Sequence, residues 1–439
     1  MNFARRLSSD WLYAIAFSLF GLFFRLWHLG AIKGWIFDEV YYAKNANSLL
    51  HHGVEIDATT HSAEFVVHPP VGKWLIALGI KAFGYNEFGW RFSAAIVGTL
   101  SITIMYFTAK KLFESQFIIN LATFFICIDG LHLVHSRTAL LDIFLTFFIQ
   151  LAFLALISKR YWWLGIFLGL AISTKWSGLY FAVAFAIIAL VSDYSYQRYL
   201  GSERSLRKVL RLRLPLRFLQ FALVPIAIYI FSWIGWFISK SGWDRTRGHN
   251  LISNFWYYHS QILYFHAHLT ESHPYQANPW GWLLMARPTS FAYSADKTCG
   301  ASSCAQEVLA LGTPLLWWSA TLALMVAIGF FISRREWRIG IILTAIGAGY
   351  LPWFFFQKRT MFSFYAISFE PFLMLALAYI CNKYLVTAPD EISEKRRKLV
   401  LTIFAGVLAA NFLYFLPVYL GTSISYNSWL DHMWLTSWI

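Results

Sequence analysis

A series of long apolar stretches runs through this chain and constrains its fold more than any other feature. They lie at about 11–29, 92–109, 117–134, 139–157, 161–174, 178–192, 218–238, 309–332, 339–356, 361–381 and 399–419. Most approach the roughly 20 residues that a helix needs to cross a bilayer. Because 58% of the residues are hydrophobic and only 13% are charged, the apolar surplus extends over the whole chain. We therefore expect an all-α integral membrane protein, a single domain over residues 1–439 with about eleven transmembrane helices.

The distribution of Lys and Arg predicts the orientation of these helices. Met1–Arg6 resembles the basic start of a signal peptide, but the apolar span after it is too long and lacks an Ala-x-Ala-type cleavage site. We expect a retained first helix with a cytoplasmic N-terminus, and an extracytoplasmic C-terminus. The cytoplasmic segments then carry most of the basic clusters, as the positive-inside rule requires. These clusters are Arg5–Arg6, Lys110–Lys111, Lys159–Arg160, Arg198–Arg217, Arg334–Arg338 and Lys383–Lys398.

Two long segments then face the outside, a first loop at 30–91 and a second loop at 239–308. The second loop contains Cys299 and Cys304, whereas the other two cysteines lie in apolar spans. The short spacing suits a small disulfide-closed loop in an oxidising compartment. A metal-binding pair is less favoured, because no second cysteine pair accompanies it.

The net charge of +14 does not indicate a nucleic-acid partner. Basic loops beside anionic membrane lipids account for such a charge. The run Arg204–Arg217 also lacks the interleaved aromatic residues of a protein that binds single strands. We expect contacts with membrane lipids and none with nucleic acid.

Adjacent carboxylates, Asp38 and Glu39, follow directly after the first apolar span. Charges beside a membrane span are costly unless they are functional or face water, and a carboxylate can take a proton from a hydroxyl group. The two acids could instead cap a helix that starts at Val40, where negative charge favours the helix dipole. We predict that the loop 30–91 carries the chemistry.

Further polar residues fall at or near the external ends of the spans. They are Arg25, His132, His135, Arg137, Asp142, Lys175, Arg287, Lys358 and Arg359. Charges so placed can converge on one cavity at the outer interface, where Lys and Arg suit a phosphate group. Two structural alternatives are an Arg137–Asp142 ion pair and a Lys175 side chain that extends to the interface. The pattern predicts a site for the anionic headgroup of a lipid.

Several motifs occur in the order seen in the protein O-mannosyltransferases, and the chain resembles that family over nearly its whole length. The motifs are Phe37–Tyr42, His68–Lys73, Arg91–Phe92, Arg137–Asp142, Thr174–Leu179, Ser272–Tyr275, Pro279–Trp282 and Arg287–Pro288. The resemblance implies a glycosyltransferase of the GT-C type in a bacterial cell membrane. Such an enzyme transfers mannose, with inversion, from polyprenyl-phosphate mannose to Ser or Thr hydroxyls of secreted or membrane proteins. The acceptors would emerge from the secretion translocon on the extracytoplasmic face.

The resemblance also implies roles for individual residues. Asp38 resembles the catalytic acidic residue and Glu39 its partner, while Arg91 and Lys175 resemble groups that face the donor phosphate. Arg137, Arg287 and Arg359 are further candidates for the phosphate site. Candidates for other substrate contacts are His68, Lys73, Asp142, Trp176, His273 and Tyr275. The second loop is too short for the β-trefoil insert of eukaryotic members, and its cysteine pair resembles bacterial, especially actinobacterial, members.

A divalent cation is compatible with this site but not required by it. Glu39 with His68 or His273 could supply mixed ligands, yet no fixed spacing marks a metal site. Three other functions are alternatives, of which a structural accessory of the translocon would not need clustered external charges. A related lipid-linked glycosyltransferase could use another sugar or a lipid acceptor, which the motifs Thr174–Leu179 and Ser272–Tyr275 disfavour. A lipid or sugar transporter or flippase would favour charges near the bilayer midplane and paired broken helices.

Overall fold

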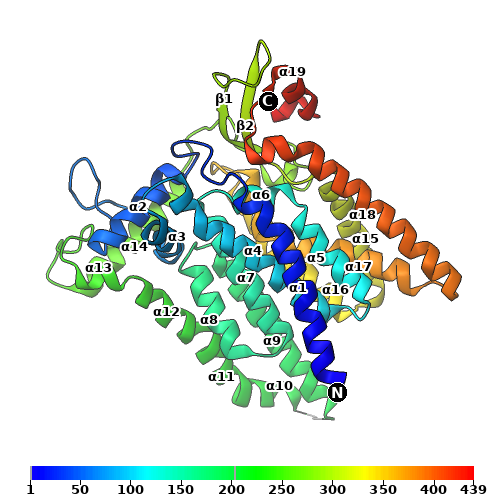
Figure 1. The fold of residues 1–439 in the computed structure, drawn as a ribbon. Coiled ribbons are helices and arrows are strands. Elements are labelled where there is room, and N and C mark those ends of the chain that lie inside the picture. The colour runs from blue at the N-terminus through cyan, green and yellow to red at the C-terminus, as the bar shows by residue number, and fades with distance from the viewer. Residues whose placement is uncertain (1, 202–203) are drawn as a thin grey trace.

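The computed structural model describes residues 2–201 and 204–439, with side chains from Ser9 onward. The predicted cytoplasmic side chains of Arg5 and Arg6 lie outside the described residues. Helices make up 69% of the structure. Figure 1 shows them as a slanted bundle with a small β-hairpin at one end and the short helices α10 (Ser205–Lys208) and α11 (Leu214–Phe218) at the other.

Every predicted apolar stretch coincides with a helix or a run of helices. Within the described part of the chain, seven helical segments are long and apolar enough to cross a membrane. They are α1 (Asn2–Leu26), α4 (Glu87–Leu112), α9 (Gly178–Tyr199), the run Ser205–Ser232, α15 (Pro314–Arg334), α16 (Trp337–Tyr350) with the turn that follows it, and α18 (Glu391–Leu420). Shorter apolar helices are α5 (Gln116–Cys127), α7 (Leu141–Ile157) and α8 (Tyr161–Ile172). The chain is therefore a multi-pass membrane protein, while the number of crossings and their orientation stay predictions.

The run Ser205–Ser232 is irregular for a reason visible in its sequence. Two π-helical segments, Val209–Arg213 and Leu219–Leu223, precede Pro215 and Pro225. Proline lacks an amide hydrogen, and its ring clashes with the carbonyl four residues earlier. A wider turn accommodates each proline without ending the helix, so α11 and α12 (Val224–Ser232) continue the same span.

The remaining helices complete the bundle and its polar end. The predicted stretch 361–381 corresponds to the 3-10 segment Ser363–Ser368 and α17 (Glu370–Val386), and α6 (Gly130–His135) follows α5. The first loop folds into α2 (Glu39–His52) and α3 (Val71–Phe83). The second loop contains α14 (Leu251–His268), preceded by α13 (Ile234–Ile238). The Tyr258 hydroxyl of α14 donates to the Val66 carbonyl, which joins the two loops.

A small antiparallel sheet departs from the all-helical expectation for the second loop. Strands β1 (Thr289–Ser294) and β2 (Cys304–Ala310) form the hairpin, and β3 (Ile424–Ser425), just after α18, pairs with the start of β2. The strands are short and lie between long apolar spans, so no alternating pattern marked them in the sequence. Helix α19 (Tyr426–His432) follows β3 and lies beside the hairpin (Figure 1).

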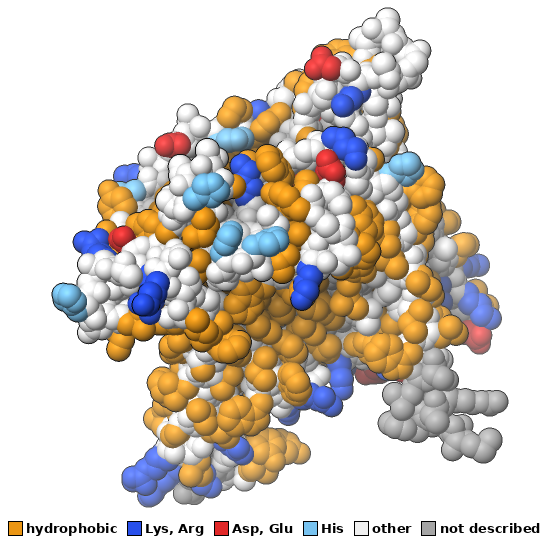
Figure 2. Space-filling view, turned by 60° about the vertical axis from the view of Figure 1, so that its left-hand side comes forward, with side chains coloured by type: hydrophobic (Ala, Val, Ile, Leu, Met, Phe, Trp, Pro, Cys, Tyr) orange, Lys and Arg blue, Asp and Glu red, His pale blue; other side chains and the backbone are white. Residues whose placement is uncertain are grey.

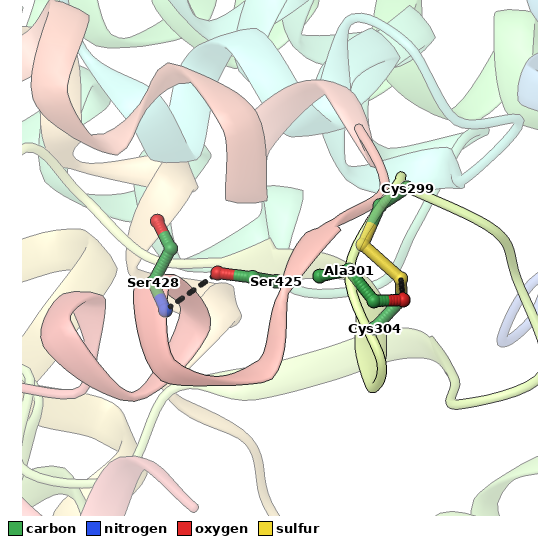
Figure 3. The surroundings of a disulfide bond; sticks show 5 residues. All are labelled: Cys299, Ala301, Cys304, Ser425 and Ser428. Carbon is green, nitrogen blue, oxygen red and sulfur yellow. Dashed lines mark hydrogen bonds between the residues drawn. A yellow bond between two sulfur atoms is a disulfide. The ribbon is translucent and has the colours of Figure 1, made fainter.

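The predicted disulfide closes the tip of this hairpin. Cys299 and Cys304 are bonded, with their Cα atoms 5.9 Å apart. Figure 3 shows the bonded pair next to Ser425 and Ser428 of the C-terminal segment. The backbone amide of Tyr426 donates to the Ser303 carbonyl, which fixes the C-terminal segment against the disulfide loop.

The surface has the distribution expected of a protein embedded in a bilayer. Figure 2 shows hydrophobic side chains forming a broad belt across one face, with histidine and basic side chains gathered above it. Many large apolar side chains on the long helices are exposed, among them Leu19, Leu322 and Ile403. Exposure of these apolar side chains to water would be unfavourable, whereas in a bilayer they contact lipid tails that are equally apolar.

Candidate active site

Asp38 lies where the irregular segment after α1 turns into α2. Phe37 adopts a left-handed backbone conformation with φ of 48°, and Asp38 occupies the N-cap position of α2. Its side chain makes no capping hydrogen bond. It lines a cavity of about 410 Å³ instead, so helix capping is not its role.

Glu39, the neighbouring acid, points away from this cavity and pairs with Arg91. The guanidinium Nε and Nη2 donate to the two Glu39 carboxylate oxygens at 2.8 and 2.7 Å. The remaining donors of Arg91 go to the carbonyls of Leu29, Ile32 and Gly34. Both side chains are fully buried. Arg91 therefore has no donor left for a phosphate, and the expectation that it faces one is not supported by its position.

Lys175 lies on the wall of the Asp38 cavity, as expected. It comes from the turn between α8 and α9, and its Nζ lies 2.9 and 3.1 Å from the two carboxylate oxygens of Asp142 at the start of α7. The Tyr365 ring centroid is 4.5 Å from the same nitrogen. Asp142 thus pairs with Lys175 and not with Arg137, so the structural alternative of an Arg137–Asp142 pair is wrong.

A second, mostly apolar cavity of about 210 Å³ continues from the first. Both are lined by His68, Lys175, His266 and Arg359. The second cavity adds apolar residues, of which Leu179 and Leu263 are more than half exposed on the surface. Trp176 also lines it. Lys175 and Arg359 therefore stand between a polar chamber that contains Asp38 and a hydrophobic groove.

Arg359 and His68 at this junction retain buried polar atoms without a partner in the described part of the chain, whereas both ring nitrogens of His266 have one. The Arg359 Nη2 approaches His266 Nδ1 at 3.4 Å, but its buried Nε has no partner among the described residues. His68 Nδ1 also lacks a partner there, and the rings of His68 and His266 are 5.3 Å apart. Unsatisfied buried donors are costly unless a ligand or water completes them. The junction can therefore accept an anionic oxygen-rich group.

The opposite end of the larger cavity is polar and contains residues that the sequence reasoning missed. Asn45 donates to Glu64 at 2.8 Å, and both line the cavity with Tyr42. Lys73, which was predicted, also lines it and is buried in an ion pair with Glu55. The only available signal for Asn45 and Glu64 was their place in the loop 30–91.

Four other predicted residues line neither cavity, namely Arg137, Arg287, His273 and Tyr275. Arg137 donates to the carbonyls of Phe24, Arg25 and Trp27 and so completes the end of α1. Arg287 donates to the carbonyls of Pro274, Ser437 and Ile439 and stacks on Tyr275. The His273 ring lies against Phe362 of the cavity wall. Arg137 and Arg287 thus serve backbone carbonyls, and their expected place at the phosphate is not supported by their positions.

The surroundings set the protonation of the groups that line the cavity. Burial raises the pKa of Asp38 to about 6, opposed by the charge of Lys175 and aided by that of Asp142. Burial lowers the pKa of Lys175, but Asp142, Tyr365 and Asp38 together more than compensate, so the net pKa is raised and the amine stays charged. Burial lowers the pKa of His68 well below its ordinary value, and that of His266 to about 4. The site thus brings the Asp38 carboxylate and the neutral imidazoles of His68 and His266 together with the basic side chains of Lys73, Lys175 and Arg359.

The suggested metal ligands are not brought together. Glu39 is taken up by Arg91 and by the backbone amides of Ile36 and Ala139. Among the described residues, no group of three His, Cys, Asp or Glu side chains is arranged to hold a metal ion.

Comparison with known proteins identifies the family. The profile "Dolichyl-phosphate-mannose-protein mannosyltransferase" matches residues 15–238, and "C-terminal four TMM region of protein-O-mannosyltransferase" matches residues 251–438. The Mycobacterium tuberculosis polyprenol-phosphate-mannose–protein mannosyltransferase is 35% identical, over 92% of this chain and 86% of its own. The Corynebacterium glutamicum protein of the same name is 31% identical, over 92% and 88%. This chain belongs to the protein O-mannosyltransferase family.

Solved structures agree with the fold of this protein O-mannosyltransferase. A chain of the Saccharomyces cerevisiae Pmt1–Pmt2 complex bound to the sugar donor superposes with a TM-score of 0.81 at 15% identity, covering 98% of this chain and 93% of its own. ArnT from Cupriavidus metallidurans bound to undecaprenyl phosphate gives 0.52 at 15% identity, covering 92% and 70%. The expected GT-C fold is confirmed.

Proposed function

We propose that this mannosyltransferase moves mannose from polyprenyl-phosphate mannose to Ser or Thr hydroxyls of polypeptides, with Asp38 as the base and Lys175 and Arg359 as the phosphate site. The observation that carries the residue roles is the continuity of the two cavities. The polar chamber that contains Asp38 and the apolar groove meet at His68, Lys175, His266 and Arg359. A lipid-linked sugar phosphate has the same three parts in the same order.

The donor fits this order. Its prenyl chain lies in the groove beside Leu179 and Leu263, and its phosphate accepts hydrogen bonds from Lys175 and Arg359. The mannose then projects into the chamber of Asp38, where Asn45 and Glu64 can bind its hydroxyl groups. Two cations supply the positive charge that a divalent ion would otherwise contribute, so we expect transfer to persist in EDTA.

Transfer forms a bond between the acceptor hydroxyl oxygen and the anomeric carbon of mannose, and it breaks the bond from that carbon to the phosphate oxygen. Asp38 takes the hydroxyl proton as the oxygen attacks. The electron pair of the broken bond stays on the phosphate, whose added charge Lys175 and Arg359 stabilise. Attack on the face opposite the phosphate inverts the anomeric carbon. A pKa near 6 keeps Asp38 ionised at neutral pH yet basic enough to accept the proton.

Asp38→Asn tests the base. Membranes containing the variant receive radiolabelled polyprenyl-phosphate mannose and a Ser/Thr-rich peptide, and labelled peptide is counted. We expect a fall of at least about 100-fold, the lower range for loss of general-base catalysis. Asp431→Asn, an exposed acid on α19, is the matched control. Undiminished transfer by Asp38→Asn at equal expression would refute the assignment.

Arg359→Ala tests the phosphate site with less risk to folding than Lys175→Ala, which would leave Asp142 buried without its partner. Loss of a charge-assisted hydrogen bond is expected to raise the donor KM by about tenfold or more. The peptide KM should change little. A donor KM equal to that of the unaltered protein would remove Arg359 from the phosphate site.

The cellular setting is also part of this proposal. We place the active site on the extracytoplasmic face of a bacterial cell membrane, where the positive-inside pattern puts the loop 30–91. The polypeptides would reach it in extended form from the secretion translocon, and the exposed apolar belt would contact membrane lipids. The oxidised Cys299–Cys304 pair supports this side of the membrane.

A further inference from the structure

A third cavity lies outside the donor site, between the segment before Asp38 and the β-hairpin. Its volume is about 380 Å³. One wall is the non-helical segment 31–36, including Lys33 and Trp35, and the other is the hairpin, including Tyr293 and Lys297. We call it the hairpin cleft. Trp35 and Tyr293 are 44% and 46% exposed, although Lys44 lies over the Trp35 ring and Trp429 packs against Tyr293, so each ring keeps part of its surface for an incoming chain.

The hairpin cleft ends close to the proposed base. Ile36 lines the cleft, and Asp38 follows two residues later. Two residues of even a fully extended chain span only about 7 Å. The intervening Phe37 stacks on Phe291 of β1 with ring centroids 4.9 Å apart, which ties the hairpin to the segment that carries Asp38. A chain lying in the cleft could therefore reach the catalytic chamber within a few residues.

The walls suit an extended polypeptide. Ala292 pairs with Val308 and Ser294 with Gln306, so these cleft residues share one face of the hairpin. Among the described strands, β1 has a neighbour on one side only, which leaves its outer edge unpaired. Open strand edges and aromatic side chains are the usual means by which proteins hold extended peptides.

The charge of the cleft is positive. Lys33 and Lys297 line it, and no carboxylate is among the lining residues. Lys33 donates to the Gly30 carbonyl at 3.2 Å and lies 3.8 Å from Glu87, and its side chain is 74% exposed. The neighbouring Asp296 is exposed but outside the lining. Both lysines are thus available to a partner that carries negative charge.

We propose that the hairpin cleft binds the acceptor polypeptide in extended form and favours acceptors with Asp or Glu beside the Ser or Thr to be modified. This inference rests on the proposed function, because it assigns the acceptor of the same reaction. The donor occupies the groove on the other side of Asp38, and the acceptor approaches along the segment 31–36.

Two peptides that share a Thr-containing core, one with acidic and one with basic flanks, test the proposal. We expect the unaltered protein to have a KM about three- to tenfold lower for the acidic peptide, as two exposed charge pairs would give. Lys33→Glu combined with Lys297→Glu should reverse the preference without changing the donor KM. Lys240→Glu, an exposed lysine away from the cleft, should leave the preference intact.

A labelling experiment measures binding without turnover. Ala31→Cys places a thiol on the cleft, and Ser241→Cys places one on another exposed segment. The acidic peptide should slow maleimide labelling of the first and not of the second. Equal KM values for both peptides before and after charge reversal, or no protection of Ala31→Cys, would overturn the proposal. The proposal would also be overturned if raising the protein concentration without peptide protected Ala31→Cys, because the cleft would then bind a second copy of the protein. Absence of transfer to either peptide by the unaltered protein would instead refute the proposed function.

Discussion

At the scale of single residues, the adjacent acids Asp38 and Glu39 have different surroundings and therefore different properties. Asp38 borders a cavity and carries a pKa raised to about 6, whereas Glu39 is fully buried against Arg91. One carboxylate can exchange a proton with a substrate, and the other cannot reach one. The pair thus combines a reactive group with an anchor that fixes the start of α2.

The pKa of Asp38 predicts the pH dependence of transfer. A base must be unprotonated, so kcat/KM should fall as the pH drops below about 6. The Asp142 charge raises this pKa, and its removal in Asp142→Asn should therefore move the acidic limb to lower pH. Initial rates measured from about pH 4.5 to about pH 8 would show the shift, because this range includes the expected pKa of Asp38 and neutral pH. An acidic limb unchanged by Asp142→Asn would argue against Asp38 as its source.

The Glu39–Arg91 pair is predicted to act on stability and not on donor binding. Glu39→Gln leaves the buried guanidinium without its counter-charge, and breaking such a pair typically costs about 3–5 kcal/mol. Thermal unfolding in detergent should show a clear loss of stability. The residual enzyme should keep a normal donor KM, whereas a raised donor KM at unchanged stability would return Arg91 to the phosphate site.

At the scale of elements, the hairpin β1–β2 depends on ties to distant parts of the chain. The disulfide closes its tip, β3 pairs with its second strand, and Phe291 packs on Phe37. Few apolar contacts hold a hairpin of this length by itself. Its position over the cleft is therefore set by these ties.

Replacement of Cys299 and Cys304 by serine should loosen the hairpin while leaving the helical bundle intact. Closing a loop this short contributes about 2 kcal/mol in the chain-entropy account. We expect faster amide exchange over β1 and β2 and a higher peptide KM, at an unchanged donor KM. Amide exchange rates equal to those of the oxidised protein would show that the contacts with β3 and Phe37 hold the hairpin in place without the disulfide.

At the scale of the whole molecule, the basic segment near α10 and the disulfide hairpin lie at opposite ends of the bundle (Figure 1). The positive-inside rule then predicts which end faces the cytoplasm. In intact cells a membrane-impermeant maleimide should label Ser241→Cys, but should label Ser333→Cys at the end of α15 only after permeabilisation. The reverse pattern would invert the topology and place Asp38 inside.

The helices could be predicted from the sequence because the length and hydrophobicity of each apolar stretch indicate a membrane helix without reference to the rest of the chain. The contacts between side chains from distant parts of the chain could not be predicted in this way. Lys175 comes from the turn between α8 and α9 and Asp142 from the first turn of α7, so the sequence could not show which basic residue Asp142 meets. Arg137 instead donates hydrogen bonds to the backbone carbonyls at the end of α1. These carbonyls lack helical partners only because the helix ends there, and that end could not be read from the sequence. Asn45 and Glu64 were missed for a similar reason, since only the folded loop turns them toward Asp38. The short strands left no pattern of their own.

The pairing of β3 with β2 has a consequence for biogenesis. Gln306 of β2 donates to the Gly421 carbonyl, 115 residues later in the chain. At synthesis rates of about 5–20 residues per second, that interval takes roughly 6–23 seconds. During it the proposed base Asp38 is already in the chain, but the hairpin lacks its contacts with Gly421 and β3, so we expect a newly made molecule to become competent for acceptors only after α18 has been inserted.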